Sequence, residues 1–207
     1  MVKVLAPAMS MEASGQLGKA LVFSKWKGRA YVRSLVKPTN PRTITQVGMR
    51  TMMAWLTQHW KDITEPNQAT WEAVAAQTVI SPFNAYVSYN QKRWRQFLGM
   101  SDAFPAAETA NIYTNTIACG GGQRFASLAI VPQAGFAGPG ILIFRHTVTA
   151  FTPNFQYAVK ILKWTTNAEL DYTDAPLAPG TYYYRSSCLT NDGQIGAPAT
   201  EDSAIVT

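Results

Sequence analysis

From about residue 111 onward, the sequence alternates between short runs rich in β-branched and aromatic residues and clusters of Gly, Pro, Asn and Asp. The runs lie at about 112–119, 125–132, 141–149, 156–164, 170–174, 181–190 and 204–207. Short strands that follow one another at this spacing, with turn signals between them, are typical of an antiparallel β-sandwich. The sequence therefore predicts an all-β domain over residues 111–207.

The first hundred residues have a different pattern, which begins with a β-hairpin around Lys27-Gly28. Glycine supplies the positive φ angle that a two-residue hairpin turn requires. The register that follows pairs Trp26 with Arg29, Ser24 with Tyr31, Val22 with Arg33 and Phe23 with Val32. One face of the hairpin is then apolar, formed by Leu21, Phe23, Ala30 and Val32. The other face mixes aromatic residues with cations, namely Trp26, Arg29, Tyr31 and Arg33.

Three helices are expected after the hairpin. The pattern Thr43-x-x-Gln46 is a capping box, and an apolar stripe of helical period follows it at Met49, Met52, Met53, Leu56 and Trp60. A second helix is expected over about 66–77, and a third from Ser81 as N-cap to about Leu98-Gly99. We predict a flexible N-terminal arm over residues 1–17, a hairpin and three-helix domain over 18–100, and a linker over 101–110. The expected fold class is α+β, with two domains.

Charge is distributed unevenly between the two halves of this 207-residue chain, whose net charge is +6. Residues 1–100 contain 13 Lys and Arg against 4 Asp and Glu, and residues 101–207 contain 5 against 8. No acid occurs between Glu12 and Asp62. The resulting positive field attracts either a polyanion or an acidic surface on another subunit.

Residues that could carry out chemistry are isolated from one another. His59 and His146 lie in different halves of the chain without a neighbouring nucleophile in the sequence. The glycine cluster at 120–122 lacks the Lys-Ser/Thr of a phosphate loop, so it predicts a turn. Asp171, Asp174 and Asp192 lack calcium-loop spacing and are expected in turns. We therefore expect no catalytic residues, no metal site, no cofactor and no enzymatic activity.

Two further features concern the environment of the chain. Cys119 and Cys188 belong to no metal or redox motif, so they either form a disulfide or remain two buried thiols, and the thiols are favoured. No run approaches the roughly 20 apolar residues needed to cross a bilayer, and the N-terminus does not have the pattern of a secretory signal. We therefore expect no membrane partner.

Several motifs in residues 15–97 carry a family resemblance: Gly15-x-x-Gly18, Trp26-Lys27-Gly28-Arg29-x-Tyr31-Val32-Arg33, Asn40-Pro41-x-Thr43-x-x-Gln46-x-x-x-Arg50, and the segment from Ser81 to Trp94. They resemble those of a group of small proteins encoded by tailed bacteriophages and by bacterial genomes with phage-like genes. The region after residue 110 is similar to the immunoglobulin-like or fibronectin-III-like modules that phages append to capsid, neck and tail proteins. Leu177-x-Pro179-Gly180-Thr181 resembles the E-to-F corner of fibronectin type III domains, where Tyr182 or Tyr183 would be the structural corner tyrosine.

The resemblance implies a non-enzymatic virion protein, located in the virion after assembly in the host cytoplasm, which decorates the capsid or belongs to the neck or tail. Its partners would be further copies of itself and other virion proteins. The hypothetical assembly interface comprises Phe23, Trp26, Arg29, Tyr31 and Arg33. A less favoured alternative is a nucleic-acid-binding accessory protein that uses Lys25, Lys27, Arg29 and Arg33. A third is a sandwich that binds host glycans or another host-surface receptor.

Overall fold

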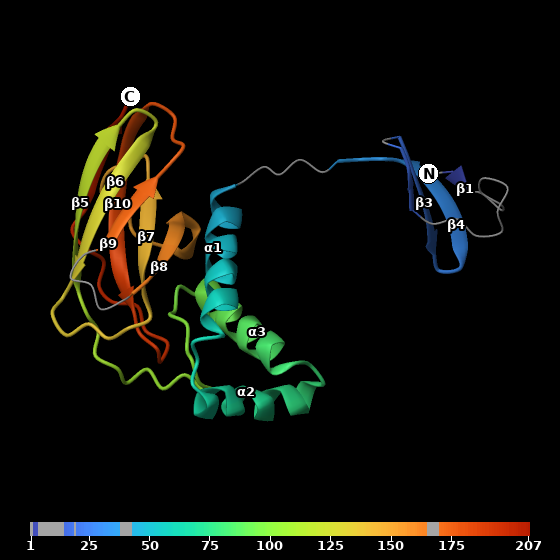
Figure 1. Ribbon diagram of the computed structural model, residues 1–207, viewed down its shortest axis with the longest axis horizontal. Helices are drawn as coiled ribbons and strands as arrows, with labels where there is room; N and C mark the ends of the chain where they lie inside the picture. The colour runs from blue at the N-terminus through green and yellow to red at the C-terminus, as the bar shows by residue number, and fades with distance from the viewer. Residues whose placement is uncertain (1, 4–14, 19, 38–42, 165–169) are drawn as a thin grey trace. The chain divides into compact units, whose positions relative to one another are not determined.

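The computed structural model describes residues 2–3, 15–18, 20–37, 43–164 and 170–207, and the chain divides into two compact units, residues 1–41 and 42–207 (Figure 1). The described residues form α-helices and antiparallel sheets, so the chain has an α+β fold. The division differs from the predicted one, because the helices belong to the same unit as the sandwich and not to the unit of the hairpin.

The N-terminal unit is an antiparallel sheet in the order β1-β4-β3-β2, built from Val2–Lys3, Gly15–Leu17, Leu21–Trp26 and Arg29–Ser34 for β1 to β4. The turn between β3 and β4 has positive φ at both central residues, 48° at Lys27 and 76° at Gly28, as a type I′ turn requires. The observed β3–β4 register is the predicted one. Two parts of the predicted flexible arm form strands, since β1 pairs with β4 and β2 pairs with β3. Residues 4–14 of the arm lie outside the described residues.

The three helices are α1 (Ile44–His59), α2 (Glu65–Thr78) and α3 (Pro82–Arg95). Both predicted side-chain caps are present: the Thr43 hydroxyl accepts a hydrogen bond from the Gln46 amide at 3.4 Å, and the Ser81 hydroxyl accepts one from the Asn84 amide at 3.2 Å. These bonds satisfy amide groups that have no partner within the first helical turn. The start of α1 and of α3 is therefore encoded locally.

The strands of the second unit form two sheets. One has the order β5-β6-β9 and the other has the order β11-β10-β7-β8. The strands are β5 (Asn115–Gly122), β6 (Phe125–Pro132), β7 (Gly140–His146), β8 (Ala158–Lys163), β9 (Leu170–Asp174), β10 (Gly180–Leu189) and β11 (Asp202–Val206). Each predicted run overlaps one of these strands, with ends shifted by a few residues. Leu128 and Ile130 of one sheet share a core with Ile141 and Ile143 of the other, so the sheets pack face to face.

The outer face of the β7-containing sheet packs against the helices. Met52, Trp55 and Leu56 of α1 share a core with Leu142 and Phe144, the residues of β7 that alternate with the sandwich-facing pair. A strand covered on both faces is expected to be continuously apolar, and residues 140–144 are buried without interruption. Figure 1 shows α1 alongside the β8 side of the sandwich, with α3 behind it and α2 at the base.

The predicted linker over 101–110 begins inside this shared core. Ser101 and Asp102 are buried, and Ser101 exchanges hydrogen bonds with the Asn90 side chain in both directions. The indole of Trp71 donates to the carbonyl of Asp102 at 2.7 Å. The start of the segment is thus fixed between α2, α3 and the sandwich, which is why the predicted domain boundary is wrong.

Candidate functional site: the two faces of the N-terminal sheet

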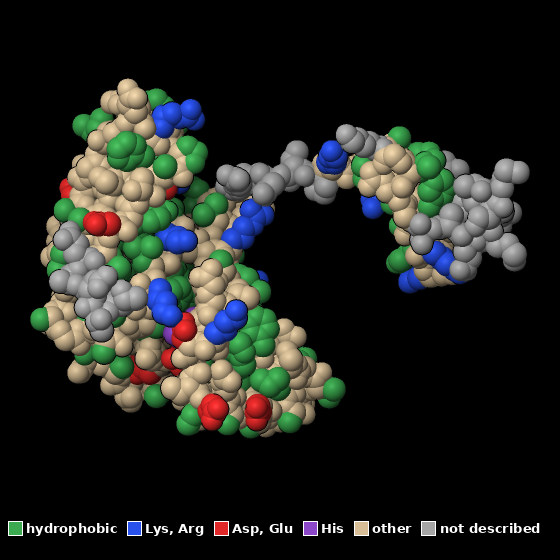
Figure 2. Space-filling model, viewed as in Figure 1, with side chains coloured by type: hydrophobic (Ala, Val, Ile, Leu, Met, Phe, Trp, Pro, Cys, Tyr) green, Lys and Arg blue, Asp and Glu red, His purple; other side chains and the backbone are tan. Residues whose placement is uncertain are grey.

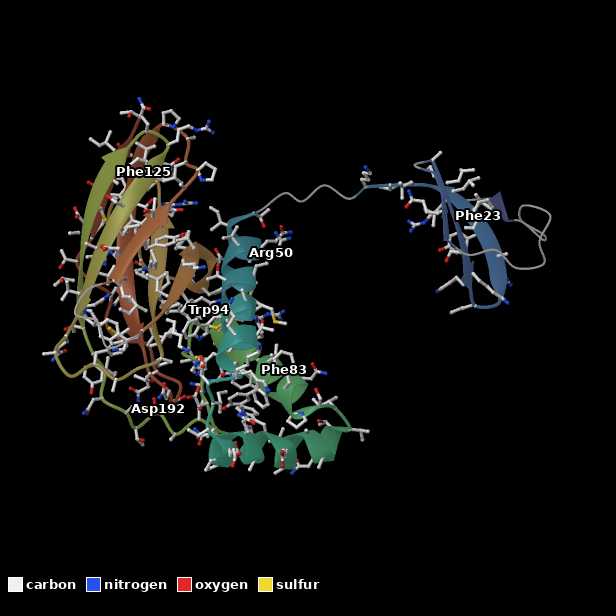
Figure 3. The ribbon with its side chains drawn as sticks, in the orientation of Figure 1. Phe23, Arg50, Phe83, Trp94, Phe125 and Asp192 are labelled. Carbon is white, nitrogen blue, oxygen red and sulfur yellow. The ribbon has the colours of Figure 1, made fainter. Side chains whose placement is uncertain are left out.

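Strand register determines how the five predicted assembly residues are arranged. Because side chains alternate between the faces of a strand, Trp26, Arg29, Tyr31 and Arg33 lie on one face and Phe23 lies on the other. The structure therefore brings four of the predicted residues together and separates the fifth from them. Phe23 is labelled in Figure 3.

The cationic face, which we define as Trp26, Arg29, Tyr31 and Arg33, combines exposed aromatic and guanidinium groups. The Trp26 side chain is 66% exposed, and both arginines are exposed. The ammonium of Lys27, in the adjacent turn, lies 4.8 Å from the centroid of the Trp26 ring. Figure 2 shows blue and green but no red side chains on the described part of this unit, in agreement with the acid-free sequence between Glu12 and Asp62.

The apolar face, which we define as Leu17, Leu21, Phe23, Ala30 and Val32, lies on the opposite side of the sheet. Leu17 is 60% exposed and Leu21 is 38% exposed, whereas the other three are half-buried. No side chain in the described part of this unit is fully buried. The sequence did not predict Leu17 as part of this face. Alternating residues in "GQLGKALVF" indicate strands, but they do not show that Leu17 pairs with Leu21.

The remaining residues of the alternative nucleic-acid site lie at the turn end of the hairpin. Lys27 occupies the turn itself, and Lys25 lies on the same side of β3 as Phe23, opposite Ala30. Of the four residues predicted to bind phosphate, only Arg29 and Arg33 therefore belong to the cationic face. Lys27 is close to this face through its contact with Trp26.

The two histidines have structural contacts. His59 Nε2 lies 2.8 Å from Asp102 Oδ1, and its ring stacks on Trp55 with centroids 5.4 Å apart. His146 Nδ1 accepts a hydrogen bond from the Val148 amide, and its ring packs between Phe151 and Tyr157. No hydrogen bond joins either ring to a serine hydroxyl or a thiol within the described residues, so neither forms a nucleophile–base pair.

Both cysteines are free thiols in the sandwich. Burial raises the pKa of Cys188 to about 12, and burial together with the negative charge of Asp202 raises the pKa of Cys119 to about 12. Because the thiolate is the nucleophilic form of cysteine, both side chains are unreactive at neutral pH.

The three predicted turn aspartates lie in different surroundings. Asp174 is buried and pairs with Arg145 at 2.6 Å, while the Tyr184 hydroxyl donates to the same carboxylate oxygen at 3.0 Å. Asp192 accepts from the Ala110 amide and the Thr190 hydroxyl, and Asp171 is exposed on β9. Within the described ranges, no group of His, Cys, Asp and Glu has the arrangement of a metal site.

Of the two tyrosines expected at the corner where β10 begins, Tyr182 bonds back to the preceding loop. Its hydroxyl donates to the carbonyl of Ala178 at 3.0 Å, which ties the start of β10 to the preceding loop. The sequence left Tyr182 and Tyr183 open for this role. Tyr183 instead packs against the core shared by the helices and the sandwich.

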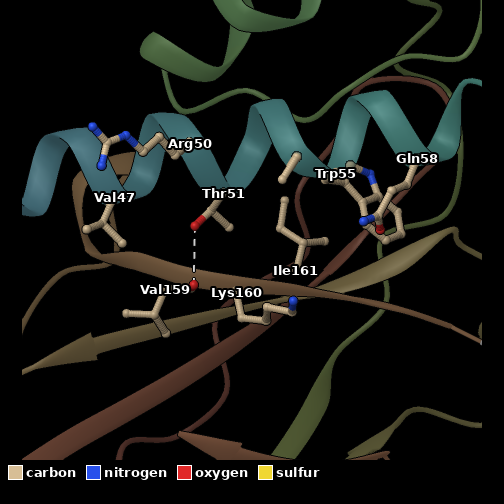
Figure 4. A pocket seen from close by; sticks show the side chains of 9 residues that line it. Val47, Arg50, Thr51, Trp55, Gln58, Val159, Lys160 and Ile161 are labelled. Atoms are coloured by element: carbon tan, nitrogen blue, oxygen red, sulfur yellow. Dashed lines mark hydrogen bonds between the residues drawn. The ribbon is translucent and has the colours of Figure 1, made fainter. Parts of the chain in front are cut away.

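A groove of about 360 Å³ separates α1 from β8, the edge strand of its sheet (Figure 4). Its lining includes the cations Arg50 and Lys160, and the Thr51 hydroxyl crosses it to donate to the Val159 carbonyl at 3.2 Å. No acid, histidine or cysteine lines it. The helix thus covers an edge strand, and the groove offers no acid–base pair for catalysis.

Comparison with known proteins gives no family. No protein-family profile and no curated protein matches the sequence. Among solved structures, a β-1,2-glucanase from Parabacteroides distasonis aligns with 50% of this chain and 14% of its own length, at 12% identity and a TM-score of 0.39. The PKD domain of an M14-like peptidase from a Thermoplasmatales archaeon covers 46% of this chain and 93% of its own, at 16% identity and a TM-score of 0.28.

A CARDB domain from Pyrococcus furiosus, solved with di-metal ions, covers 47% of this chain and 96% of its own at 12% identity and a TM-score of 0.24. All three TM-scores are below 0.5, so these similarities support no conclusion about fold or function. Among the described helices, none is both long enough and apolar enough to span a membrane.

Proposed function

We propose that this chain is a non-enzymatic structural protein of a tailed-phage particle, which associates with copies of itself through the apolar face of its N-terminal sheet. The observation that carries the proposal is that this sheet exposes Leu17 and Leu21 beside Phe23 and Val32, and buries no side chain within its own described residues. A small sheet of this kind needs a second layer to be stable in water. The family resemblance of residues 15–97 supplies the phage assignment.

The charge of the two faces favours the apolar one for self-association. If two copies met through their cationic faces, Arg29 and Arg33 of one would approach the same residues of the other, and like charges that lose their hydration repel strongly. Two apolar faces instead remove hydrocarbon from water, at about 25 cal/mol for each Å² buried. Phe23 therefore belongs to the assembly surface, and the other four predicted assembly residues do not.

We further propose that the sandwich is of the immunoglobulin or fibronectin-III type and is the part displayed by the particle. Three features support this type: the antiparallel sheets of β5-β6-β9 and β11-β10-β7-β8, their shared core, and the bond from Tyr182 to the preceding loop. Display is consistent with the absence of any catalytic arrangement among the described side chains.

The test of self-association is the mass of the full-length protein in solution by light scattering, at micromolar concentration and at low and high salt. We expect a defined oligomer that persists in high salt, because apolar burial is not screened. Phe23→Gln and Leu17→Gln should shift the mass toward the monomer. Leu17→Gln is the cleaner variant, because this side chain is already 60% exposed.

The matched control is Val79→Gln, which removes another exposed aliphatic side chain, 94% exposed at the end of α2. Its mass should equal that of the wild type. A monomeric wild type, or an unchanged oligomer in both sheet variants, would refute assembly through the apolar face.

A further inference from the structure

We infer that the cationic face of the N-terminal sheet binds single-stranded nucleic acid, as a second function that does not depend on self-association through the apolar face. The face places two exposed arginines and an exposed tryptophan on one side of a hairpin that contains no acid. Cations for phosphates and aromatic rings for bases are the two components of single-strand binding sites.

The main rival partner is an acidic protein surface, above all the acid-rich second half of another copy. The structure disfavours it, because most described acids of residues 43–207 already have partners. Four are paired with a lysine or arginine of their own unit: Asp62 with Lys163, Glu108 with Arg93, Asp174 with Arg145 and Glu201 with Arg185. Asp102 lies within hydrogen-bond distance of the His59 ring. Asp192 and Asp202 accept backbone hydrogen bonds.

The described acids that remain are few and dispersed. Glu65 and Glu72 are exposed on α2, and Asp171 is exposed on β9. No cluster of exposed acids in the described part of the second unit therefore complements the cationic face. A partner with a regular array of negative charge is therefore a molecule other than a second copy of this chain. Nucleic acid is a polyanion whose bases can also stack on an exposed tryptophan.

The exposed tryptophan favours an unstacked strand over a duplex. Arg29, Tyr31 and Arg33 follow one another on one face of β4 at intervals of two residues, or about 7 Å, and form a row along which a single strand can extend. Trp26 lies directly opposite Arg29 on β3 and is 66% exposed, and a base can stack on its ring only when that base is not stacked within a helix.

The experiment measures binding of full-length protein to a fluorescein-labelled oligo(dT) of 15 nucleotides by fluorescence anisotropy. Each phosphate contact to a single strand contributes about −0.7 to the slope of log K against log salt. Contacts from Lys27, Arg29 and Arg33 therefore predict a slope of about −2, and affinity about 20-fold lower in 200 mM than in 50 mM salt.

Four variants separate charge from stacking. The double variant Arg29→Gln/Arg33→Gln should lose about two thirds of the slope, whereas Arg29→Lys/Arg33→Lys should keep it. Trp26→Ala should weaken binding about tenfold with little change in slope. Lys160→Gln is the control, because it removes an exposed cation of β8 outside the N-terminal unit, and it should bind as the wild type does.

Three results would overturn the inference. The first is no binding to oligo(dT) at 50 mM salt, and the second is wild-type binding by both Arg29→Gln/Arg33→Gln and Trp26→Ala. The third is binding of poly-glutamate that is equally tight and that responds to the same variants in the same way. The last would identify an acidic protein surface as the partner. Phe23→Gln separates this inference from the proposed function, since it should dissociate the oligomer and retain the salt-dependent binding. If the wild-type protein were itself a monomer and still bound oligo(dT) in this manner, only the proposed assembly would be refuted.

Discussion

Trp94 illustrates how single buried side chains of residues 42–207 serve packing and hydrogen bonding together. Its ring is completely buried, and its indole nitrogen donates to the carbonyl of Gly48 in α1 at 3.1 Å. Figure 3 labels Trp94 beside the lower part of α1. The sequence contains no signal for this hydrogen-bond partner, which lies 46 residues away. This contact depends on how α1 and α3 cross, which the local sequence around Trp94 does not determine.

Trp94→Phe should lower the free energy of unfolding by about 1–3 kcal/mol, because it removes the indole hydrogen bond to the Gly48 carbonyl and opens a small cavity. Urea unfolding measures the loss. The control is Trp60→Phe, at a half-buried ring held by contacts with Phe83 and Tyr86, which should cost less. Equal losses in the two variants would show that the indole hydrogen bond contributes nothing.

Asp192 gives a prediction about pH. Burial raises the pKa of its carboxyl, but hydrogen bonds from the Thr190 hydroxyl and the Ala110 amide outweigh burial and hold the pKa below its usual value. A depressed pKa in the folded state means that the stabilisation is complete above the unfolded pKa, about 3.9, and is lost as the pH falls below it. Asp192→Asn should therefore destabilise the protein by about 1 kcal/mol at pH 7, a value discounted for partial exposure.

The measurement is the urea midpoint of the wild type and of Asp192→Asn at pH 7 and pH 3. The difference between the two proteins should shrink at pH 3, because this pH lies below the unfolded pKa of about 3.9 and proton uptake by the unfolded carboxyl removes part of the stabilisation. A difference that stays constant between the two pH values would exclude the ionised carboxylate as its source.

At the scale of elements, local signals were sufficient for the hairpin turn, its register and two helix caps. They were not sufficient to show which surface each apolar stripe covers. The stripe of α1 has the same period whether it packs against two other helices or against a sheet. The run Gly140–Phe144, apolar without alternation, did carry this information, since a strand at the surface of a sandwich exposes alternate residues. The two faces of the N-terminal sheet follow from register alone, whereas the β2–β3 pairing required the structure.

Gly48 marks the closest approach of α1 to the sandwich and carries the next prediction. A Cβ atom at this position would lie 2.0 Å from the backbone oxygen of Phe155, in the 3₁₀ turn before β8. Gly→Ala within a helix ordinarily stabilises by about 1 kcal/mol. Here we expect Gly48→Ala to destabilise by about 1–3 kcal/mol, because α1 must move away from the sheet.

Thermal and urea unfolding of Gly48→Ala test this sign. The control is Glu72→Ala, an exposed position of α2, which should change the free energy of unfolding by less than about 0.5 kcal/mol. A stabilised Gly48→Ala variant would show that α1 adapts to the added methyl group without loss of packing.

At the scale of the whole molecule, we expect residues 43–164 and 170–207 to unfold as one unit, because two hydrophobic cores share β7. One core lies between the helices and the β7-containing sheet, and the other lies between the two sheets. Leu142 and Ile143 are adjacent on β7 and both completely buried, yet Leu142 faces the core shared with the helices and Ile143 faces the core between the sheets. One strand therefore belongs to both cores. The helical region cannot unfold without exposing a face of the sheet that the sandwich needs covered.

The last prediction follows from this shared strand. Leu142→Ala and Ile143→Ala should each lower the free energy of unfolding by about 2–5 kcal/mol, and both should shift the same transition. Tryptophan fluorescence reports mainly on the helical region, because Trp55, Trp71 and Trp94 lie in the helices and Trp60 is the C-cap of α1. Far-UV circular dichroism reports on helices and strands together. The two signals should change at one urea midpoint in the wild type and in each variant, as a two-state unit requires. If Leu142→Ala moved the fluorescence midpoint and left a later circular-dichroism transition in place, the helices and the sandwich would unfold independently. Residues 101–110 would then separate two units that unfold independently, as the sequence predicted.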